Sequence, residues 1–295
     1  MSAAGPSQGA NAPAGGSASV GAYKPLLSLK DVHTHIGAYH ILHGVDLEVP
    51  SGQLTMLLGR NGAGKTTTLR TIMGLWPASQ GQVQFDGQAI GGPGVKISTP
   101  DIAQRDIAYV PENMGIFAEL TVSENLLLAA RHASRVSELD TVRLEWLFGL
   151  FPALKKFWLY PAGKLSGGQK QMLAIARAMI EPRRLLLIDE PSKGLAPAII
   201  RNMISALREL KQELNPQEPA SGLHPPGGAA GLGAARRPAT TVLLVEQNFM
   251  VARELGDTVA VMDNGRVVHA GGMAELAEDE GLQQRLLGLS LGAHQ

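Results

Sequence analysis

The sequence predicts an α/β fold whose core is a parallel β-sheet. Continuous apolar runs at 54–58, 185–188 and 241–245 are typical of parallel strands that are covered on both faces. A glycine-rich loop follows the first run and leads into a helix, which is the local order of a phosphate-binding loop. Between residues 120 and 177 the apolar spacing becomes helical, which indicates a helical insertion within the domain.

Length and composition exclude several functions. The 295 residues suffice for one large α/β domain. Lys plus Arg and Asp plus Glu both total 26, and this zero net charge argues against nucleic acid as a partner, because nucleic-acid binders usually carry a basic surplus. The chain has no cysteine, so neither a disulfide nor a thiolate metal site can form. No apolar run approaches the roughly eighteen residues of a membrane-spanning helix. If the protein works at a membrane, we therefore expect a partner protein to cross the bilayer.

The residues around the glycine-rich loop predict a tail followed by short strands. Residues 1–22 are rich in Ala, Gly, Ser and Pro, a composition typical of disorder. Segments 26–32 and 44–49 alternate apolar with polar residues, as half-buried antiparallel strands do. Segments 82–87 and 107–110 predict two further strands.

The helical insertion is predicted to cover about 113–165. Thr121 and Glu124 have the spacing of a capping box, so we expect a helix to begin there. Apolar residues at helical spacing predict a second helix near 142–151.

The last third of the chain predicts strands, a long loop and a final helix. Prolines, glycines and alanines at 213–240 predict a flexible surface insertion, with a regulatory or docking loop as the alternative. Asp263-Asn264-Gly265 is a hairpin signal. An amphipathic helix is predicted at 273–287, followed by a short tail at 290–295.

The glycine-rich loop predicts a site for nucleotide phosphates. Glycines let successive backbone N–H groups point at phosphate oxygens, and the helix that follows adds its positive N-terminal end. Lys65 would contact the β and γ phosphates, and the hydroxyl of Thr66 would bind Mg²⁺. The predicted phosphate-binding residues are consecutive: Gly59, Arg60, Asn61, Gly62, Ala63, Gly64, Lys65, Thr66 and Thr67.

Two carboxylates follow the apolar run 185–188. Asp189 is suited to hold Mg²⁺ through its water shell, and Glu190 to act as the general base that polarises an attacking water. The alternative is an acidic turn in solvent, which the upstream phosphate loop disfavours.

Leu165 is followed by Ser166, Gly167, Gly168 and Gln169 at the start of a predicted helix. With this LSGGQ pentapeptide the sequence resembles the ABC ATPase superfamily of P-loop NTPases over about 26–289. The resemblance implies a parallel core sheet, an antiparallel β subdomain and ATP as the nucleotide. It also implies that the pentapeptide of one subunit closes over the γ-phosphate held by another, and a serine with glycine N–H groups at a helix N-terminus suits an anion. Taken alone, the serine could be a plain helix cap.

Three positions depart from the superfamily pattern in a way that resembles one subfamily. Glu112 stands where a Gln contacts Mg²⁺, Gln247 where a histidine contacts the γ-phosphate, and Ala196 where an aspartate is usual. Together with Thr121-Val122-Ser123-Glu124-Asn125-Leu126, this set resembles the ATP-binding subunits of Liv-type importers for branched-chain and other hydrophobic amino acids, of the F kind. The resemblance therefore implies Glu190 and Gln247 as catalytic residues, and Thr66, Glu112 and Asp189 as metal contacts.

That resemblance implies an ATP-hydrolysing subunit at the cytoplasmic face of the inner (plasma) membrane. The implied partners are permease subunits, a second ATPase subunit in a heterodimer or homodimer, and indirectly a solute-binding protein. A permease helix would enter a groove near Glu112, where Met114, Ile116 and Phe117 are either contacts or core of the insertion. The adenine would stack near Gly37, on His35 or Tyr39, although packing is an equal role for Tyr39 and for Ile36.

Three alternatives remain open. The chain could serve a urea, lipid or other small-solute transporter, since related subunits occur there. A soluble ABC ATPase of DNA maintenance would need a long coiled coil between the loop and the pentapeptide, and no sustained heptads occur there. A nucleotide sensor without turnover would not need Glu190.

Overall fold

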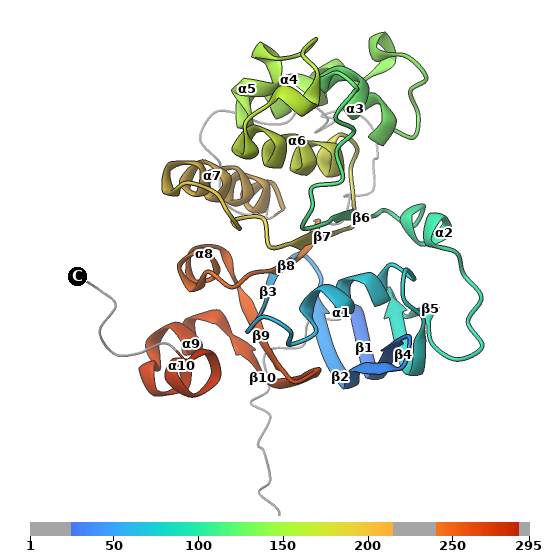
Figure 1. The fold of residues 1–295 in the computed structure, drawn as a ribbon, viewed down its shortest axis with the longest axis vertical. Helices are drawn as coiled ribbons and strands as arrows, with labels where there is room; N and C mark the ends of the chain where they lie inside the picture. The colour runs from blue at the N-terminus through green and yellow to red at the C-terminus, as the bar shows by residue number, and fades with distance from the viewer. Residues whose placement is uncertain (1–24, 215–239, 289–295) are drawn as a thin grey trace, which may run out of the picture.

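A computed structural model of the protein describes residues 25–214 and 240–288. In these ranges the chain forms two β-sheets, with one group of helices stacked above them and another at one side (Figure 1). The predicted tails 1–22 and 290–295, and nearly all of the predicted insertion 213–240, lie outside the described residues. Helix α7 (Pro197–Leu214) runs past the expected start of that insertion.

The first sheet is antiparallel, as the alternating sequence predicts. Its strand order is β2-β1-β4-β5, and each neighbouring pair is antiparallel. Leu27 and Leu29 point into the core while Lys30 is exposed, which is the pattern of a sheet with one solvated face. The strands are β1 (Pro25–Ile36), β2 (Tyr39–Pro50), β4 (Ala78–Phe85) and β5 (Gln88–Gly91).

The second sheet is the predicted parallel core. Its order is β10-β9-β3-β8-β7-β6, in which β9 through β6 run parallel and β10 pairs antiparallel with β9 across the predicted hairpin turn. The strands are β3 (Leu54–Gly59), β6 (Ile107–Val110), β7 (Leu185–Asp189), β8 (Thr241–Val245), β9 (Thr258–Asp263) and β10 (Arg266–Gly272).

Both faces of the parallel sheet are buried, which explains the continuous apolar runs. Leu57 faces the core that contains Leu69 of α1 (Lys65–Ile72) and the antiparallel sheet. Its neighbours Met56 and Leu58 face the other core, which extends into the helical insertion as far as Phe151.

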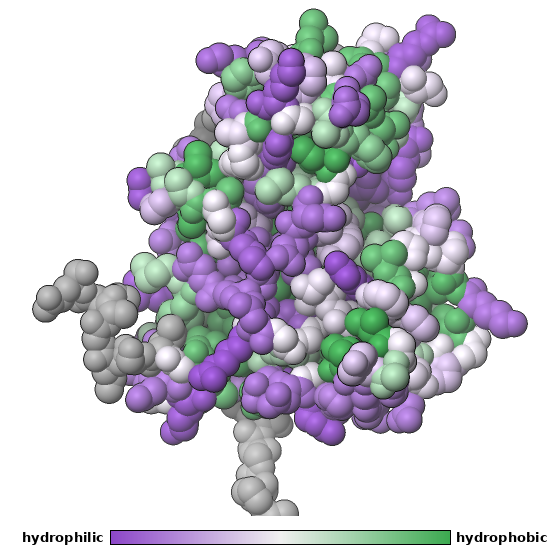
Figure 2. All heavy atoms as spheres, in the orientation of Figure 1, coloured by the Kyte–Doolittle hydropathy of each residue, from purple (hydrophilic) through white to green (hydrophobic). Residues whose placement is uncertain are grey.

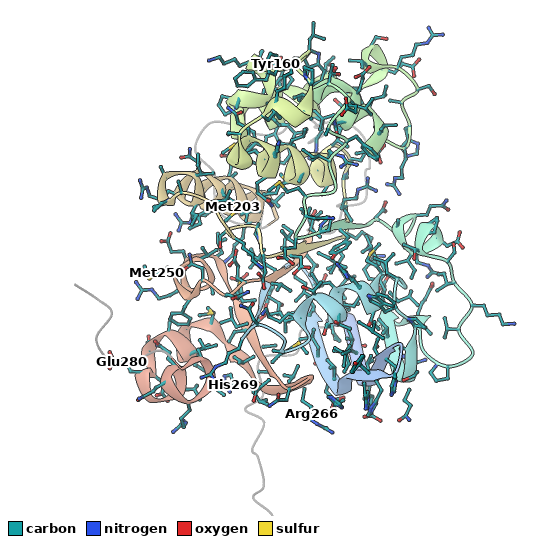
Figure 3. The ribbon with its side chains drawn as sticks, in the orientation of Figure 1. Tyr160, Met203, Met250, Arg266, His269 and Glu280 are labelled. Carbon is teal, nitrogen blue, oxygen red and sulfur yellow. The ribbon has the colours of Figure 1, made fainter. Side chains whose placement is uncertain are left out.

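The helical insertion forms the upper layer in Figure 1, with Tyr160 at its far end (Figure 3). The predicted capping box is confirmed, because the Thr121 hydroxyl accepts the N–H of Glu124 at 3.2 Å while Glu124 Oε2 accepts the N–H of Thr121 at 2.8 Å. The helices of this layer are α3 (Val122–Ala129), α4 (Thr141–Leu150), α5 (Pro152–Lys156) and α6 (Gly167–Met179).

The predicted single helix at 273–287 is wrong. The segment forms α9 (Met273–Glu278) and α10 (Glu280–Leu287), which are separated at Asp279. Asp279 leaves helical geometry, and its Oδ1 accepts the N–H of Leu282 at 2.8 Å, so it starts a second helix. The short helices α2 (Thr99–Ala103) and α8 (Phe249–Leu255) complete the connections. Among the described helices, none has both the length and the apolar character needed to cross a membrane.

We expect Phe151→Ala to lower the free energy of unfolding by about 3–5 kcal/mol, because truncation of a large core side chain leaves a cavity. The ring of Phe151 is 1% exposed in the core shared by the insertion and the sheet. The control is Phe117→Ala, whose ring is 49% exposed and should cost less than about 1 kcal/mol. Urea unfolding followed by circular dichroism measures both, and equal losses would contradict the assigned core.

Candidate active site

The carboxyl ends of four parallel strands meet at one edge of the sheet. In the order β3, β8, β7 and β6, these ends lead to the glycine-rich loop, Gln247, Asp189 with Glu190, and Glu112. Hydrophilic side chains cover the centre of the molecule in the face that Figure 2 shows, between the helical layer and the antiparallel sheet. The structure thus brings together predicted site residues from four separate stretches of the sequence.

The glycine-rich loop needs glycine at two positions in particular. Gly59 has φ 148°, and a Cβ there would lie 2.3 Å from the carbonyl oxygen of Met262. Gly64 has φ 101°, and its Cβ would lie 2.9 Å from the side chain of Leu42. Any larger residue would therefore push the loop away from β9 or β2, since both the backbone angles and the space favour glycine.

Lys65 lies between the loop and the end of β7. Its side chain is 4% exposed, and Nζ donates hydrogen bonds to the carbonyl oxygens of Gly59 at 2.8 Å and Arg60 at 3.0 Å. Nζ is also 3.5 Å from Glu190 Oε1. The ammonium group has three donors and lies beside the glycine-rich loop, so it can bind a phosphate oxygen held by the loop.

Asp189 is buried and has two hydroxyl neighbours. Thr66 Oγ1 donates to Asp189 Oδ1 at 3.1 Å, and the Tyr109 hydroxyl lies 3.3 Å from Oδ2. Burial raises the pKa of Asp189, although the hydrogen bond from Thr66 opposes the rise, and the charges of Glu190 and Glu112 add to it. Burial, together with the charge of Asp189, raises the pKa of Tyr109 to about 12, so this hydroxyl keeps its proton and donates to the carboxylate.

These oxygen donors suit a magnesium ion. Mg²⁺ binds through one or two carboxylates together with substrate phosphates more often than in an all-protein cage. The buried carboxylate of Asp189 beside the Thr66 hydroxyl offers such a half-site. In residues 25–214 and 240–288, no group of three or more His, Cys, Asp or Glu is arranged to hold a metal on its own.

Glu190 is held by contacts on both carboxylate oxygens. Its side chain is 8% exposed, Oε1 accepts Gln247 Nε2 at 2.5 Å, and Oε2 lies 3.5 Å from Lys193 Nζ. Its backbone has φ 45°, a left-handed conformation that is costly for a residue other than glycine and is concentrated at functional sites. Gln247 Nε2 also donates to Asn61 Oδ1 at 2.6 Å, so this amide links the glycine-rich loop to Glu190.

Sequence reasoning missed three residues of the site: Tyr109, Lys193 and Glu246. Lys193 Nζ donates to Glu112 Oε1 at 2.5 Å, and its only sequence signal is its place three residues after Glu190. Glu246 is buried and accepts both the N–H and the hydroxyl of Ser192, at 3.0 and 2.9 Å. Glu246 therefore ties the loop after β7 to the end of β8.

The pentapeptide lies apart from the loop of its own chain. Ser166 caps α6, because its Oγ accepts the N–H of Gln169 at 3.3 Å and Gln169 Oε1 accepts the N–H of Ser166 at 2.9 Å. Helix α6 belongs to the helical layer, whereas α1 lies beside the antiparallel sheet (Figure 1). Ser166 and Gly167 are exposed, and Gly168 is buried against Ile199 of α7. Within the described residues, Ser166 therefore acts as a helix cap, which is one of the two roles that the sequence allows for it.

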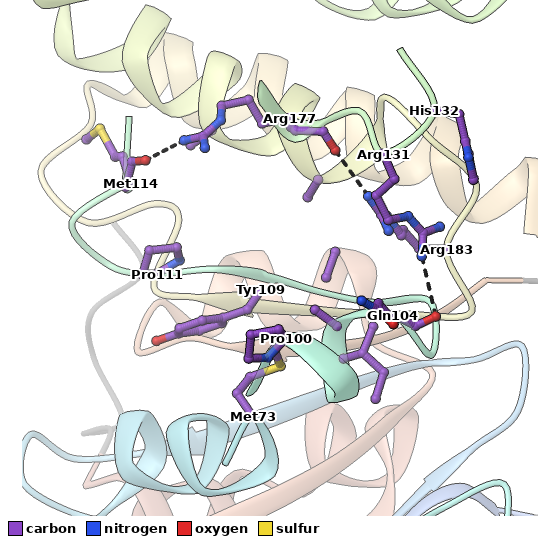
Figure 4. A pocket seen from close by; sticks show the side chains of 17 residues that line it. Met73, Pro100, Gln104, Tyr109, Pro111, Met114, Arg131, His132, Arg177 and Arg183 are labelled. Carbon is purple, nitrogen blue, oxygen red and sulfur yellow. Dashed lines mark hydrogen bonds between the residues drawn. The ribbon is translucent and has the colours of Figure 1, made fainter. Parts of the chain in front are cut away.

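A groove of about 990 Å³ lies between α2, β6, α3 and α6 (Figure 4). Its apolar lining includes Met73, Pro100, Ile107 and Met114. Met114 therefore lies at the groove, whereas Phe117 does not line it and instead places its ring 5.1 Å from the Arg177 guanidinium. Ile116 packs against the core of the helical layer. Tyr109 and Arg177 also line the groove, and Arg177 donates to the carbonyl oxygen of Gly115.

The candidates for adenine stacking, His35 and Tyr39, lie with Ile36 around the turn between β1 and β2. The His35 ring stacks on His40 at 4.2 Å and bonds Ser79 Oγ at 3.0 Å. Tyr39 is well exposed, and Ile36 is half-buried. Which of these side chains contacts the base stays a prediction.

We expect Glu246→Gln to change how stability depends on pH. Burial raises the pKa of Glu246 above its unfolded value, so the folded state retains a proton that the unfolded state has lost. The contribution of Glu246 to stability is thus full below the unfolded pKa and is lost as pH rises through the folded pKa. Glutamine does not titrate. The free energy of unfolding of the variant, relative to that of the wild type, should therefore rise between about pH 4 and about pH 7.

Urea unfolding at several pH values tests this expectation. Glu145→Gln, at an exposed carboxylate of the helical layer, is the matched control. A difference between Glu246→Gln and wild type that stays constant with pH would contradict the assigned cause.

Comparison with known proteins identifies the family. A family model described as "ABC transporter" matches residues 42–193. The high-affinity branched-chain amino acid transport ATP-binding protein BraG of Pseudomonas aeruginosa is 36% identical over 252 residues, which cover 85% of this chain and 95% of BraG. The probable branched-chain amino acid transport ATP-binding protein LivF of Archaeoglobus fulgidus is 32% identical over 250 residues, covering 85% of this chain and 93% of LivF.

A crystal structure of a nucleotide-free ATP-binding cassette from an ABC transporter has the same fold. Its TM-score is 0.67 at 21% identity, and the match covers 90% of this chain and 100% of that one. These findings confirm the resemblance and the fold class inferred from the glycine-rich loop and the pentapeptide. The chain belongs to the ABC transporter family of ATP-binding cassettes, whose members hydrolyse ATP to power transport.

Proposed function

We propose that this chain binds MgATP at the carboxyl edge of its parallel sheet and hydrolyses it to energise the import of branched-chain amino acids. The observation that carries the proposal is the convergence of Lys65, Thr66, Asp189 and Glu190 at that edge. The two relatives with branched-chain amino acid transport in their names support the substrate class.

The chain's own residues would bind and orient the triphosphate. Backbone N–H groups of the loop 59–64 and the ammonium group of Lys65 contact the phosphates, while the N-terminus of α1 adds a favourable field. The Thr66 hydroxyl and the Asp189 carboxylate would hold Mg²⁺, with Tyr109 fixing the second oxygen of Asp189. The ion supplies positive charge that offsets the charge on the phosphate oxygens.

Glu190 is the general base in this proposal. A water attacks the γ-phosphorus, the bond to the β-phosphate oxygen breaks to release ADP, and the proton of the water passes to Glu190. Its low exposure and its hydrogen bond from Gln247 fix the direction of the carboxylate. The Gln247 amide donates to Asn61 and to Glu190, so exchanging its bond to Asn61 for one to a γ-phosphate at the loop would keep its bond to Glu190.

The pentapeptide gives the reason for a second ATPase subunit. Ser166 and Gly167 are exposed at the N-terminus of the long helix α6, away from the loop of their own chain. A second ATPase subunit, identical or related, would place these groups against the γ-phosphate of this one, with Gly168 and Gln169 supporting the turn.

The groove beside β6 is the site proposed for a permease helix. Apolar side chains line it together with Arg131, Arg177 and Arg183. Tyr109 also lines it while bonding Asp189, so the groove adjoins the proposed metal site. In this arrangement the chain is peripheral at the cytoplasmic face of the inner membrane, and a solute-binding protein acts on it through the permease.

We expect Glu190→Gln to lower MgATP hydrolysis at least about 100-fold with ATP binding retained, because the general base is lost and the site keeps its shape. Lys65→Ala should lose ATP binding itself. Lys155→Ala, at an exposed lysine of the helical layer, is the control. Phosphate release and equilibrium ATP titration measure these effects, and full ATP affinity in Lys65→Ala would contradict the assigned site.

Uptake of labelled solutes by cells tests the proposed substrate class. Loss of the chain from cells should lower uptake of labelled leucine, isoleucine and valine and leave urea uptake unchanged. The opposite pattern would favour the urea transporter alternative.

We expect Met114→Lys to weaken assembly with the permease while MgATP binding stays unchanged. A lysine there replaces an apolar lining side chain and adds a fourth long cationic side chain to those of Arg131, Arg177 and Arg183. Leu159→Lys, at an apolar side chain that is 77% exposed and outside the groove, is the matched control. Co-purification of the transporter complex measures assembly, and equal recovery of both variants would contradict this use of the groove.

A further inference from the structure

We propose that Lys193 is a positioning residue that holds the carboxylates of Glu112 and Glu190 in register for ATP hydrolysis. The proposal rests on the proposed function and concerns the loop that follows Glu190. Lys193 Nζ lies 2.5 Å from Glu112 Oε1 and 3.5 Å from Glu190 Oε2. One ammonium group therefore contacts carboxylates that follow two different strands, β6 and β7.

Hydrogen bonds hold the backbone segment that leads to Lys193. The N–H of Glu190 donates to the carbonyl oxygen of Val245 at 2.9 Å, and the N–H of Lys193 donates back to the carbonyl oxygen of Glu190 at 3.2 Å. Between them, Ser192 is held by the buried carboxylate of Glu246. The Cα of Lys193 thus has a set position, although its side chain is 55% exposed.

Charge balance at the edge of the sheet gives Lys193 its function. The carboxylates of Glu112, Asp189 and Glu190 all lie at the carboxyl ends of the paired strands β6 and β7. Lys65 Nζ bonds two loop carbonyls and lies near Oε1 of Glu190. Lys193 Nζ lies near the other oxygen, Oε2, and also donates a hydrogen bond to Glu112 Oε1, so one cation contacts both carboxylates.

The arrival of a triphosphate adds further negative charge beside these groups. Without Lys193, Glu112 would be repelled from the phosphate, and Glu190 would lose the cation on one side of its carboxylate. The importance of Lys193 should therefore depend on the charge at position 112. A neutral Glu112→Gln side chain needs no compensating cation.

A double-mutant cycle in the assembled transporter tests this dependence. We expect Lys193→Met to lower kcat for MgATP about tenfold in the wild-type background, and less than about twofold in the Glu112→Gln background, because residues in one charge network are not additive. Lys193→Arg should retain activity. The matched control is Lys155→Met, which removes a lysine of similar exposure from its ion pair with Glu145 in the helical layer.

Two further readouts separate positioning from a structural role. The unfolding midpoint of Lys193→Met should equal that of the wild type, and KM for MgATP should change less than kcat. An equal loss in both backgrounds, or no loss in either, would overturn the role of Lys193. If the wild type hydrolyses MgATP, such a result leaves the proposed function intact; if it does not, both proposals fall.

Discussion

The register of four parallel strands is the constraint on which the site depends. Leu57 of β3 pairs with Val245 of β8, which pairs with Asp189 of β7, and Ile188 pairs with Val110 of β6. Parallel pairing aligns the carboxyl ends of the strands, so the residues that follow them meet without long loops. A slip of one residue would turn Asp189 toward the opposite face of the sheet.

The loops beyond these strands hold one another through polar contacts. Gln247 joins the glycine-rich loop to Glu190, Glu246 joins the end of β8 to Ser192, and Lys193 joins the end of β7 to Glu112. Each contact links the ends of two strands. The loop after β7 therefore carries the base candidate Glu190, whose backbone is left-handed, together with Ser192 and Lys193, which bind groups at the ends of β8 and β6.

Local sequence pattern predicts most of the strands and the first helix of the insertion. Strands covered on both faces, alternating strands and capping boxes are each recognisable from a few consecutive residues. The roles of Tyr109, Lys193 and Glu246 could not be predicted, since each depends on a partner that the sheet brings from a distant stretch of sequence. The break at Asp279 was missed for another reason. The apolar spacing continues across it, and only the side-chain cap divides the helix.

The core that joins the helical layer to the sheet limits how that layer can move. Met56 of β3 and Phe151 beyond α4 belong to one continuous apolar cluster. Tightly packed side chains do not deform continuously, so a displacement of the layer has to slide them past one another as a shear. A hinge motion about an exposed linker would instead separate the layer from the sheet and expose this apolar cluster to water. Small sliding shifts of α6 over the sheet are therefore the mode of motion that this packing favours.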